Sequence, residues 1–104
     1  MKKGPKHIYI YTLSHPVTNE VYYVGRTKSP ERRSREHAGY AFPYDGNRLK
    51  ATNFAIRVAT GLSPVFTVVE QVEHKHARVR EGYWIQTLLK SCSLVNYSLG
   101  VVVL

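Results

Sequence analysis

Four tyrosines gather in a short stretch near the start of the chain: Tyr9, Tyr11, Tyr22 and Tyr23. A phenol can take part in proton transfer, but its usual pKa of about 10 makes it a poor base unless nearby cations favour the phenolate. Tyrosine is also a common strand residue whose ring is readily half-buried, so all four could simply serve packing. The tyrosines therefore gain meaning only from the residues that accompany them.

A basic segment with a histidine follows these tyrosines. Arg33 and His37 are four residues apart and would share one face of a helix. Arg32 and Arg35 would point elsewhere, and Glu36 would lie on another side. Arginine suits bidentate phosphate binding and histidine can transfer a proton near neutral pH, although such a run of charge is often only a solvated face.

A carboxylate interrupts an apolar stripe in the last third of the chain. Three residues at spacings of seven and four predict one apolar face of a helix: Ala77, Trp84 and Leu88. Glu81 falls inside that stripe, where a carboxylate needs an arginine, a metal or a proton as partner. It could form a salt bridge, for instance with Arg57 or Arg78. It could equally hold Mg²⁺ beside phosphate, where one carboxylate with waters and substrate oxygens is a normal site.

The charge balance favours a polyanionic partner. Fifteen Lys and Arg face seven Asp and Glu, for a formal charge of +8, and ten of the fifteen lie within the first fifty residues. Nucleic acid is the usual partner of such a domain, whereas no long basic amphipathic helix favours a membrane surface. No apolar run reaches the roughly 18 residues of a membrane span. A single cysteine, Cys92, excludes an intrachain disulfide and a four-cysteine zinc site, which favours a reducing cytosol.

The elements that must position these residues follow from periodicity and turn signals. Alternating β-branched and aromatic residues predict strands at 7–13, 21–25 and 65–69, the first two forming a hairpin. Helices are expected at 30–38, 47–60 and 74–90, with residues 40–46 as a loop. The apolar face of the second helix is expected at Ala51, Phe54, Ala55, Val58 and Ala59. The order ββααβα predicts a single α+β domain over residues 1–104, with a small, mostly antiparallel three-stranded sheet flanked by helices.

Taken together, these residues resemble the GIY-YIG nuclease family. Tyr9-Ile10-Tyr11 stands where the family has its first motif, with Tyr9 in place of glycine, and Tyr23-Val24-Gly25 stands for the second, with valine in place of isoleucine. The separation of twelve residues between Tyr11 and Tyr23 fits the family. An alternative register would make Tyr9 the catalytic phenol, and Tyr11 is preferred because only it has the right distance to Tyr23.

The resemblance continues to about residue 100. Gly25-Arg26-Thr27 looks like the family's Gly-Lys/Arg-Thr, and Arg33 maps to its catalytic arginine. His37 maps to the family's His or Tyr four residues later, Glu81 to the metal-binding glutamate and Asn96 to a late asparagine. Many members carry a second domain for DNA recognition, and we expect none here.

The resemblance implies a metal-dependent endonuclease that hydrolyses phosphodiester bonds in nucleic acid. Glu81 would hold one Mg²⁺ or Mn²⁺ ion, Arg33 would support the transition-state charge, and Tyr11 would be the general base. Tyr23 would orient the attacking water, and His37 would accept the proton of Tyr11 or contact the phosphate. Arg26 and the metal would favour the Tyr11 phenolate. Nucleic-acid contacts are expected at Arg26, Lys28, Arg32, Arg35 and Asn96.

Several alternatives stay open at this point. The chain could be a non-catalytic nucleic-acid-binding domain that retains the nuclease fold. It could also work as a homodimer or with a partner subunit that supplies specificity, and the apolar residues 101–104 could mark that interface or complete the core. DNA is the expected substrate, but phosphate contacts do not distinguish DNA from RNA or duplex from branched and single strands. We expect a cytoplasmic protein of bacterial or phage origin that is not membrane-bound.

Overall fold

The computed structural model describes residues 7–38 and 48–90 of the 104-residue chain. Its elements are strands β1 (His7–Ser14) and β2 (Val21–Thr27), helices α1 (Pro30–Ala38) and α2 (Arg48–Thr60), and strand β3 (Val65–Glu73). A 3₁₀ turn, η1 (His74–His76), and helix α3 (Ala77–Leu89) follow. The predicted order ββααβα and the α+β class are confirmed, and the last predicted helix begins as the separate 3₁₀ turn.

The three strands form one antiparallel sheet in the order β2-β1-β3. β1 is central because it pairs with β2 over Tyr9↔Thr27 to Ser14↔Val21 and with β3 over His7↔Glu73 to Ser14↔Val65. β3 continues four residues beyond the predicted end, through a polar stretch. An edge strand needs only backbone pairing on one side and tolerates polar side chains, which is why its alternation did not reveal its length.

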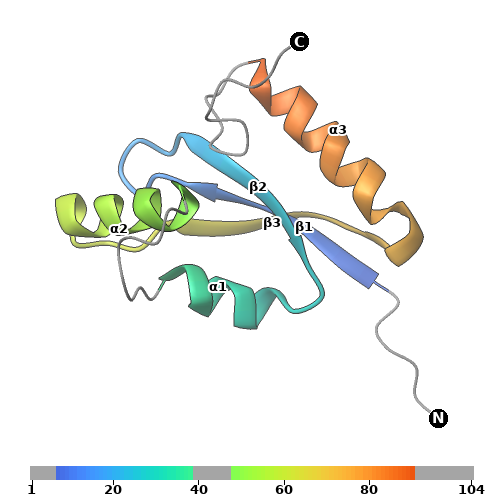
Figure 1. Ribbon diagram of the computed structural model, residues 1–104, viewed down its shortest axis with the longest axis horizontal. Coiled ribbons are helices and arrows are strands. Elements are labelled where there is room, and N and C mark those ends of the chain that lie inside the picture. The colour runs from blue at the N-terminus through green and yellow to red at the C-terminus, as the bar shows by residue number, and fades with distance from the viewer. Residues whose placement is uncertain (1–6, 39–47, 91–104) are drawn as a thin grey trace.

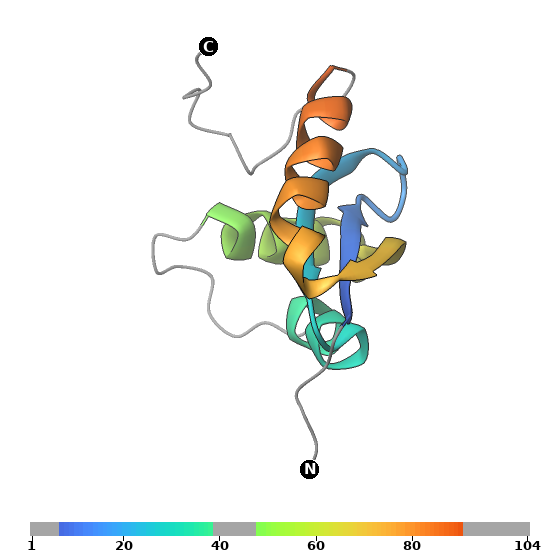
Figure 2. The same ribbon diagram turned by 90° about the vertical axis from the view of Figure 1, so that its right-hand side faces the viewer.

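Helices cover both faces of this sheet (Figures 1 and 2). On one face, Ile85 of α3 packs with Ile10 and Val24 of the two paired strands. On the other face, Ile56 of α2 packs with the apolar cluster that contains Tyr11. Because neighbouring residues of β1 point to opposite faces, Ile10 and Tyr11 belong to different clusters. The phenol of Tyr11 therefore faces α1 and α2.

The buried face of α2 differs from the predicted one. Val58 is 68% exposed, and Ala55 and Ala59 are also exposed, whereas Asn53 and Ile56 are buried. Two faces of this helix satisfy helical spacing, and local spacing alone does not distinguish them. The stripe that packs contains Asn53, whose amide finds hydrogen-bond partners inside.

A tight turn between β2 and α1 sets the direction of the helix that holds Arg33. The Ser29 N–H donates to Thr27 Oγ1 at 3.0 Å, and the Arg33 N–H donates to the Ser29 carbonyl at 3.0 Å. Thr27 is the last residue of β2, so the helix begins directly at the strand end, as the Ser29-Pro30-Glu31 sequence predicts. The predicted contact at Asn96, the predicted loop 40–46, the apolar residues 101–104 and Cys92 all lie outside the described residues.

None of the described helices has both the length and the apolar character needed to cross a membrane.

Candidate active site

Tyr11 lies at the centre of the predicted site, in the middle of β1. It is fully buried, and its Cα partner on β2 is Gly25. A Cβ at position 25 would lie 2.5 Å from the Tyr11 hydroxyl oxygen and 2.8 Å from Cε2 of Tyr23. Glycine is therefore required at position 25 because the Tyr11 ring lies across its backbone.

Two side chains of α1 meet the Tyr11 hydroxyl. His37 Nε2 lies 2.8 Å from the hydroxyl oxygen, and Arg33 Nε donates to the same oxygen at 3.3 Å. The ring stacks on Phe66 of β3 with centroids 4.4 Å apart, and the Tyr23 ring lies 6.1 Å away. The structure thus brings together Tyr11, Tyr23, Arg33 and His37. Spacing predicted that Arg33 and His37 share a helix face, and the resemblance implied that they lie near the two tyrosines.

Burial governs the protonation of these groups. It raises the pKa of Tyr11 well above its ordinary value, and the neighbouring Tyr23 adds to the rise while Arg33 opposes it. Burial also lowers the pKa of His37 to about 4, assisted by the positive charge of Arg33. At neutral pH the free protein therefore holds a neutral phenol beside a neutral imidazole.

Arg33 is held between Tyr11 and Glu36. Its Nη1 atom lies 2.7 Å from Glu36 Oε1, and Arg32 reaches the other oxygen of Glu36 at 3.1 Å. Burial alone would lower the pKa of Arg33, but the bonds to Glu36 and Tyr11 raise it overall, so the guanidinium stays charged. The expectation that Glu36 lies apart from Arg33 is wrong, because residues three apart on a helix are neighbours.

Glu81 of α3 faces β2 and pairs with Arg26. The distance from Arg26 Nε to Glu81 Oε1 is 3.5 Å, and the Glu81 side chain is 22% exposed. Burial raises the pKa of Glu81 and Arg26 opposes that rise. The salt-bridge partner of Glu81 is thus Arg26 rather than Arg57 or Arg78. Arg26 was also expected to assist the Tyr11 phenolate, and it pairs with Glu81 instead.

The residues around Glu81 fit a cation site built on one carboxylate. Among the described residues, no three His, Cys, Asp or Glu side chains gather as a metal-binding cluster. A magnesium ion beside phosphate needs only one or two carboxylates, since waters and substrate oxygens complete the shell. Arg26 already neutralises the carboxylate of Glu81, so a metal ion could bind there only after this ion pair opens.

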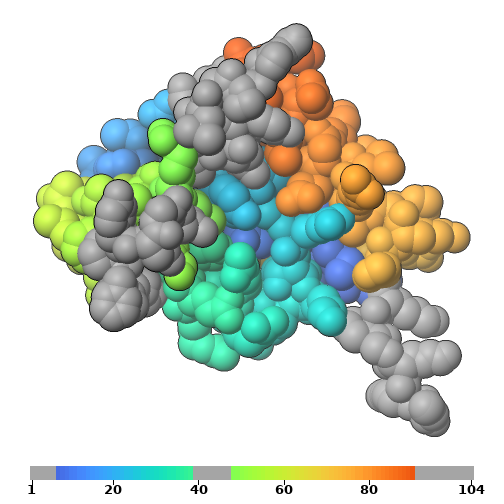
Figure 3. Space-filling model, in the orientation of Figure 1, coloured from blue at the N-terminus to red at the C-terminus, as the bar shows by residue number. Residues whose placement is uncertain are grey.

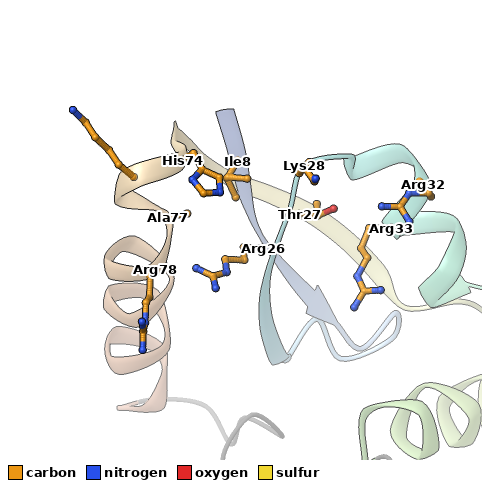
Figure 4. A pocket seen from close by; sticks show the side chains of 10 residues that line it. Ile8, Arg26, Thr27, Lys28, Arg32, Arg33, His74, Ala77 and Arg78 are labelled. Carbon is orange, nitrogen blue, oxygen red and sulfur yellow. The ribbon is translucent and has the colours of Figure 1, made fainter. Parts of the chain in front are cut away.

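A cleft of about 650 Å³ runs between α1 and the start of α3, across the end of β2. Six cationic side chains line it: Arg26, Lys28, Arg32, Arg33, Lys75 and Arg78. Figure 4 shows Arg78 at one side, Arg33 at the other and Arg26 between them. In the space-filling view, atoms of β2 lie between those of α1 and α3 (Figure 3). Arg33 joins the cleft to Tyr11, and Arg26 joins it to Glu81.

The predicted nucleic-acid contacts divide between two places. Arg26, Lys28 and Arg32 line the cleft, whereas Arg35 lies over a shallow depression with Phe66 and Val68. No sequence signal places Lys75 of η1 and Arg78 of α3 at a nucleic-acid site, and the structure shows both at the cleft. Asn53 was not predicted as a site residue either. Its position on the same helix face as Leu49 and Ile56 was the sequence signal that could have indicated a buried polar contact.

The comparisons with known proteins agree with this geometry. Residues 7–94 match the family model described as the GIY-YIG catalytic domain. A search of curated proteins found no match, and a search of solved structures found none. The matched segment covers most of the chain and contains the whole of the sheet, the three helices, and the Tyr11, Arg33 and Glu81 side chains. The chain therefore belongs to the GIY-YIG family of nuclease-type domains.

Proposed function

We propose that this protein is a metal-dependent endonuclease that hydrolyses phosphodiester bonds in nucleic acid, with DNA as the substrate. One observation carries the proposal. The Tyr11 hydroxyl is held by His37 and Arg33, and Arg33 also lines a cleft with six cationic side chains. A phosphate in that cleft would meet a fixed positive charge and a proton-transfer group together.

Each residue near Tyr11 has a role that its position supports. Arg33 stays charged and would stabilise the negative charge that builds on the phosphorus oxygens in the transition state. Tyr11 would act as the general base, with its phenolate stabilised by the Arg33 guanidinium. Tyr23 lies beside both the Tyr11 and His37 rings and would orient the attacking water.

Glu81 would hold one divalent cation, Mg²⁺ or Mn²⁺. A bound cation would supply Lewis acidity and stabilise the leaving oxygen. The ion pair with Arg26 would have to open, since both cations need the same carboxylate oxygens. Arg26 lines the cleft and would then be free to contact a phosphate.

The cleft supports a nucleic acid backbone as the bound group. Lys28 and Arg78 line it and, within residues 7–38 and 48–90, neither has a carboxylate partner. Their charges are therefore available to phosphates. Asn96 is proposed as a further contact on the strength of the motif alone. A cytoplasmic location suits such a substrate, and a homodimer or partner subunit would add sequence specificity.

One observation favours a second candidate, a nucleic-acid-binding domain without catalysis. Tyr11 is fully buried and its pKa is raised, so its phenol is not a base in the free protein. An active enzyme must open this site or lower that pKa when substrate and metal bind. A binding domain would need neither change, and would keep the cationic cleft.

Cleavage assays separate the two candidates. Labelled duplex, branched and single-stranded DNA and RNA are incubated with the protein, with and without Mg²⁺. We expect metal-dependent cleavage that Arg33→Ala lowers by about two to three orders of magnitude. Arg32→Ala, one residue away and also in the cleft, serves as the control and should mainly weaken binding. Tight binding of these substrates without cleavage under any metal would favour the binding domain.

A further inference from the structure

His37 has a second set of partners on the side away from Tyr11. The Tyr22 hydroxyl donates to Asn53 Oδ1 at 2.6 Å, and Asn53 Nδ2 lies 3.3 Å from His37 Nδ1. Tyr22, Asn53 and His37 are exposed by only 8%, 8% and 7%. A buried chain of polar groups therefore runs from β2 through α2 to α1 and ends at the Tyr11 hydroxyl.

The direction of each hydrogen bond in this chain follows from the atoms. The amide oxygen of Asn53 accepts the proton of Tyr22, so the amide nitrogen faces His37. An amide nitrogen can only donate, and Nδ1 of His37 must then accept. A neutral imidazole carries one ring proton, which must lie on Nε2, the atom 2.8 Å from the Tyr11 oxygen.

We propose that Asn53 is a positioning residue that fixes the His37 tautomer in which Nε2–H donates to the Tyr11 oxygen, and that Tyr22 orients the Asn53 amide for this purpose. Its catalytic consequence rests on the nuclease function proposed above. The Tyr11 oxygen then receives two donors, His37 Nε2–H and Arg33 Nε–H. Two donors stabilise a phenolate, which is the form a general base needs.

The opposite amide orientation would have the opposite effect. Asn53 Oδ1 would accept the proton of His37 Nδ1, Nε2 would present a lone pair, and Tyr11 would donate its proton to the ring. The Tyr11 oxygen would then keep only Arg33 Nε–H as a donor, and its phenolate would be less stable. The hydroxyl of Tyr22 favours the first state, because its buried O–H proton has Asn53 Oδ1 as acceptor there and would face an amide N–H group in the other state.

The other groups around His37 leave Nδ1 to Asn53. Tyr11 and Phe66 face the imidazole from β1 and β3, and Tyr23 faces it from β2. Arg33 and Glu36 act on it from its own helix through charge. Among the described residues, every buried side-chain nitrogen and oxygen has a hydrogen-bond partner. The Asn53 amide is thus the group that can set the His37 tautomer, through its contact with Nδ1.

Nitrogen-15 NMR of the histidine side chains tests the tautomer without any need for activity. In the full chain labelled at histidine, with His37 assigned by its loss in His37→Gln, we expect a protonated Nε2 and an unprotonated Nδ1. Asn53→Asp keeps the shape but offers only acceptors, so it should move the proton to Nδ1. Asn19→Asp makes the same chemical change at the exposed hairpin turn and should leave the His37 signals unchanged.

Single-turnover cleavage then links the tautomer to rate. Asn53→Asp should slow cleavage by about tenfold or more and alter the pH profile of the rate, with nucleic-acid binding unchanged. Tyr22→Phe loses only the orienting hydroxyl and should show both tautomers with a smaller loss of rate. It carries the test should Asn53→Asp not fold.

Two results would overturn the role of Asn53. One is a wild-type His37 protonated at Nδ1. The other is a folded Asn53→Asp protein with the wild-type tautomer and the wild-type rate. Failure of the wild-type protein to cleave any substrate would instead refute the nuclease function, and the NMR result would still decide the tautomer.

Discussion

Tyr11 is the residue on which the proposed chemistry depends, through its hydroxyl group. This hydroxyl contacts His37 and Arg33 of α1. Substitution by phenylalanine removes the hydroxyl oxygen and keeps the ring. Tyr11→Phe should leave folding and binding close to wild type because one hydroxyl is lost and little volume changes. Single-turnover cleavage should fall by about two orders of magnitude or more, as expected for loss of a general base.

Tyr9→Phe is the matched control for that substitution. Tyr9 precedes Tyr11 by two residues on the same strand and pairs with Thr27, while the contacts to His37 and Arg33 belong to Tyr11. The control should cleave at nearly the wild-type rate. Loss of cleavage in Tyr9→Phe alone would place the first motif two residues earlier. Normal cleavage by both variants would remove the phenol from the mechanism and make His37 the base to test.

His37 gives the fold a measurable pH dependence. Its pKa falls from the ordinary 6.5 to about 4 on folding, chiefly through burial. The unfolded chain therefore binds the proton first as pH falls, so stability is full above pH 6.5 and is lost between 6.5 and about 4. The loss should reach roughly 3 kcal/mol.

Urea unfolding at a series of pH values measures this loss. His37→Gln lacks the titrating group, so its free energy of unfolding should change less steeply than that of the wild type over the same pH range. Equal slopes for the two proteins would show that His37 is not held neutral by burial.

At the scale of the elements, the antiparallel pairing of β1 with β2 fixes the geometry of the site, because it places Tyr11 opposite Gly25. The Tyr11 ring occupies the space above Gly25, and a methyl group there would meet it at 2.5–2.6 Å. Gly25→Ala should destabilise the fold by about 1–3 kcal/mol through overpacking, and should impair cleavage by displacing the phenol.

Gly82→Ala is the control from a different element. Gly82 lies within α3, and a Cβ there would meet nothing within 4 Å. This variant should raise the free energy of unfolding by up to about 1 kcal/mol, because alanine favours a helix interior. Chemical denaturation compares the two. Equal stability of Gly25→Ala and wild type would mean that the ring does not lie across this glycine.

The elements themselves were largely predictable from the sequence. Apolar alternation predicted β1 and β2, and Ser29, Pro30 and the spacing after them predicted α1, because these signals are local. The end of β3 and the buried face of α2 were not predicted. Both depend on what packs against the element, which local spacing does not contain.

The site was predictable in part for the same reason. The spacing of Arg33 and His37 placed both on one helix face, and the motif pointed to Tyr11. Contacts between side chains of different elements could not be predicted from the sequence. Examples are the ion pair of Arg26 with Glu81 and the contact of Asn53 with His37. Such pairs depend on how helices cross the sheet rather than on positions along the chain.

At the scale of the whole molecule, six of the fifteen Lys and Arg side chains line one cleft. Lys28 stands at the end of β2 and Arg78 on α3, so a bound strand would span both sides. Lys28→Ala and Arg78→Ala should each weaken nucleic-acid binding and reduce the slope of log affinity against log salt by about 0.9, the loss of one phosphate contact.

Arg35→Ala tests whether binding is confined to that cleft. Arg35 lies on the same helix as Arg33 but faces the depression beside Phe66 and Val68. Its loss should leave the salt slope at the wild-type value, as measured by fluorescence anisotropy at several salt concentrations. A reduction equal to that of Lys28→Ala would show that the nucleic acid also wraps around the outer side of α1.

The most direct test of a metal-dependent nuclease is cleavage by the wild type and by Glu81→Gln, with Mg²⁺ and with EDTA. Glutamine keeps the size of the side chain but loses the charge that would hold the cation. The wild type should cleave in Mg²⁺ and not in EDTA, while Glu81→Gln should bind the same substrate and not cleave it. Undiminished cleavage by Glu81→Gln, or by the wild type in EDTA, would contradict the metal-dependent mechanism.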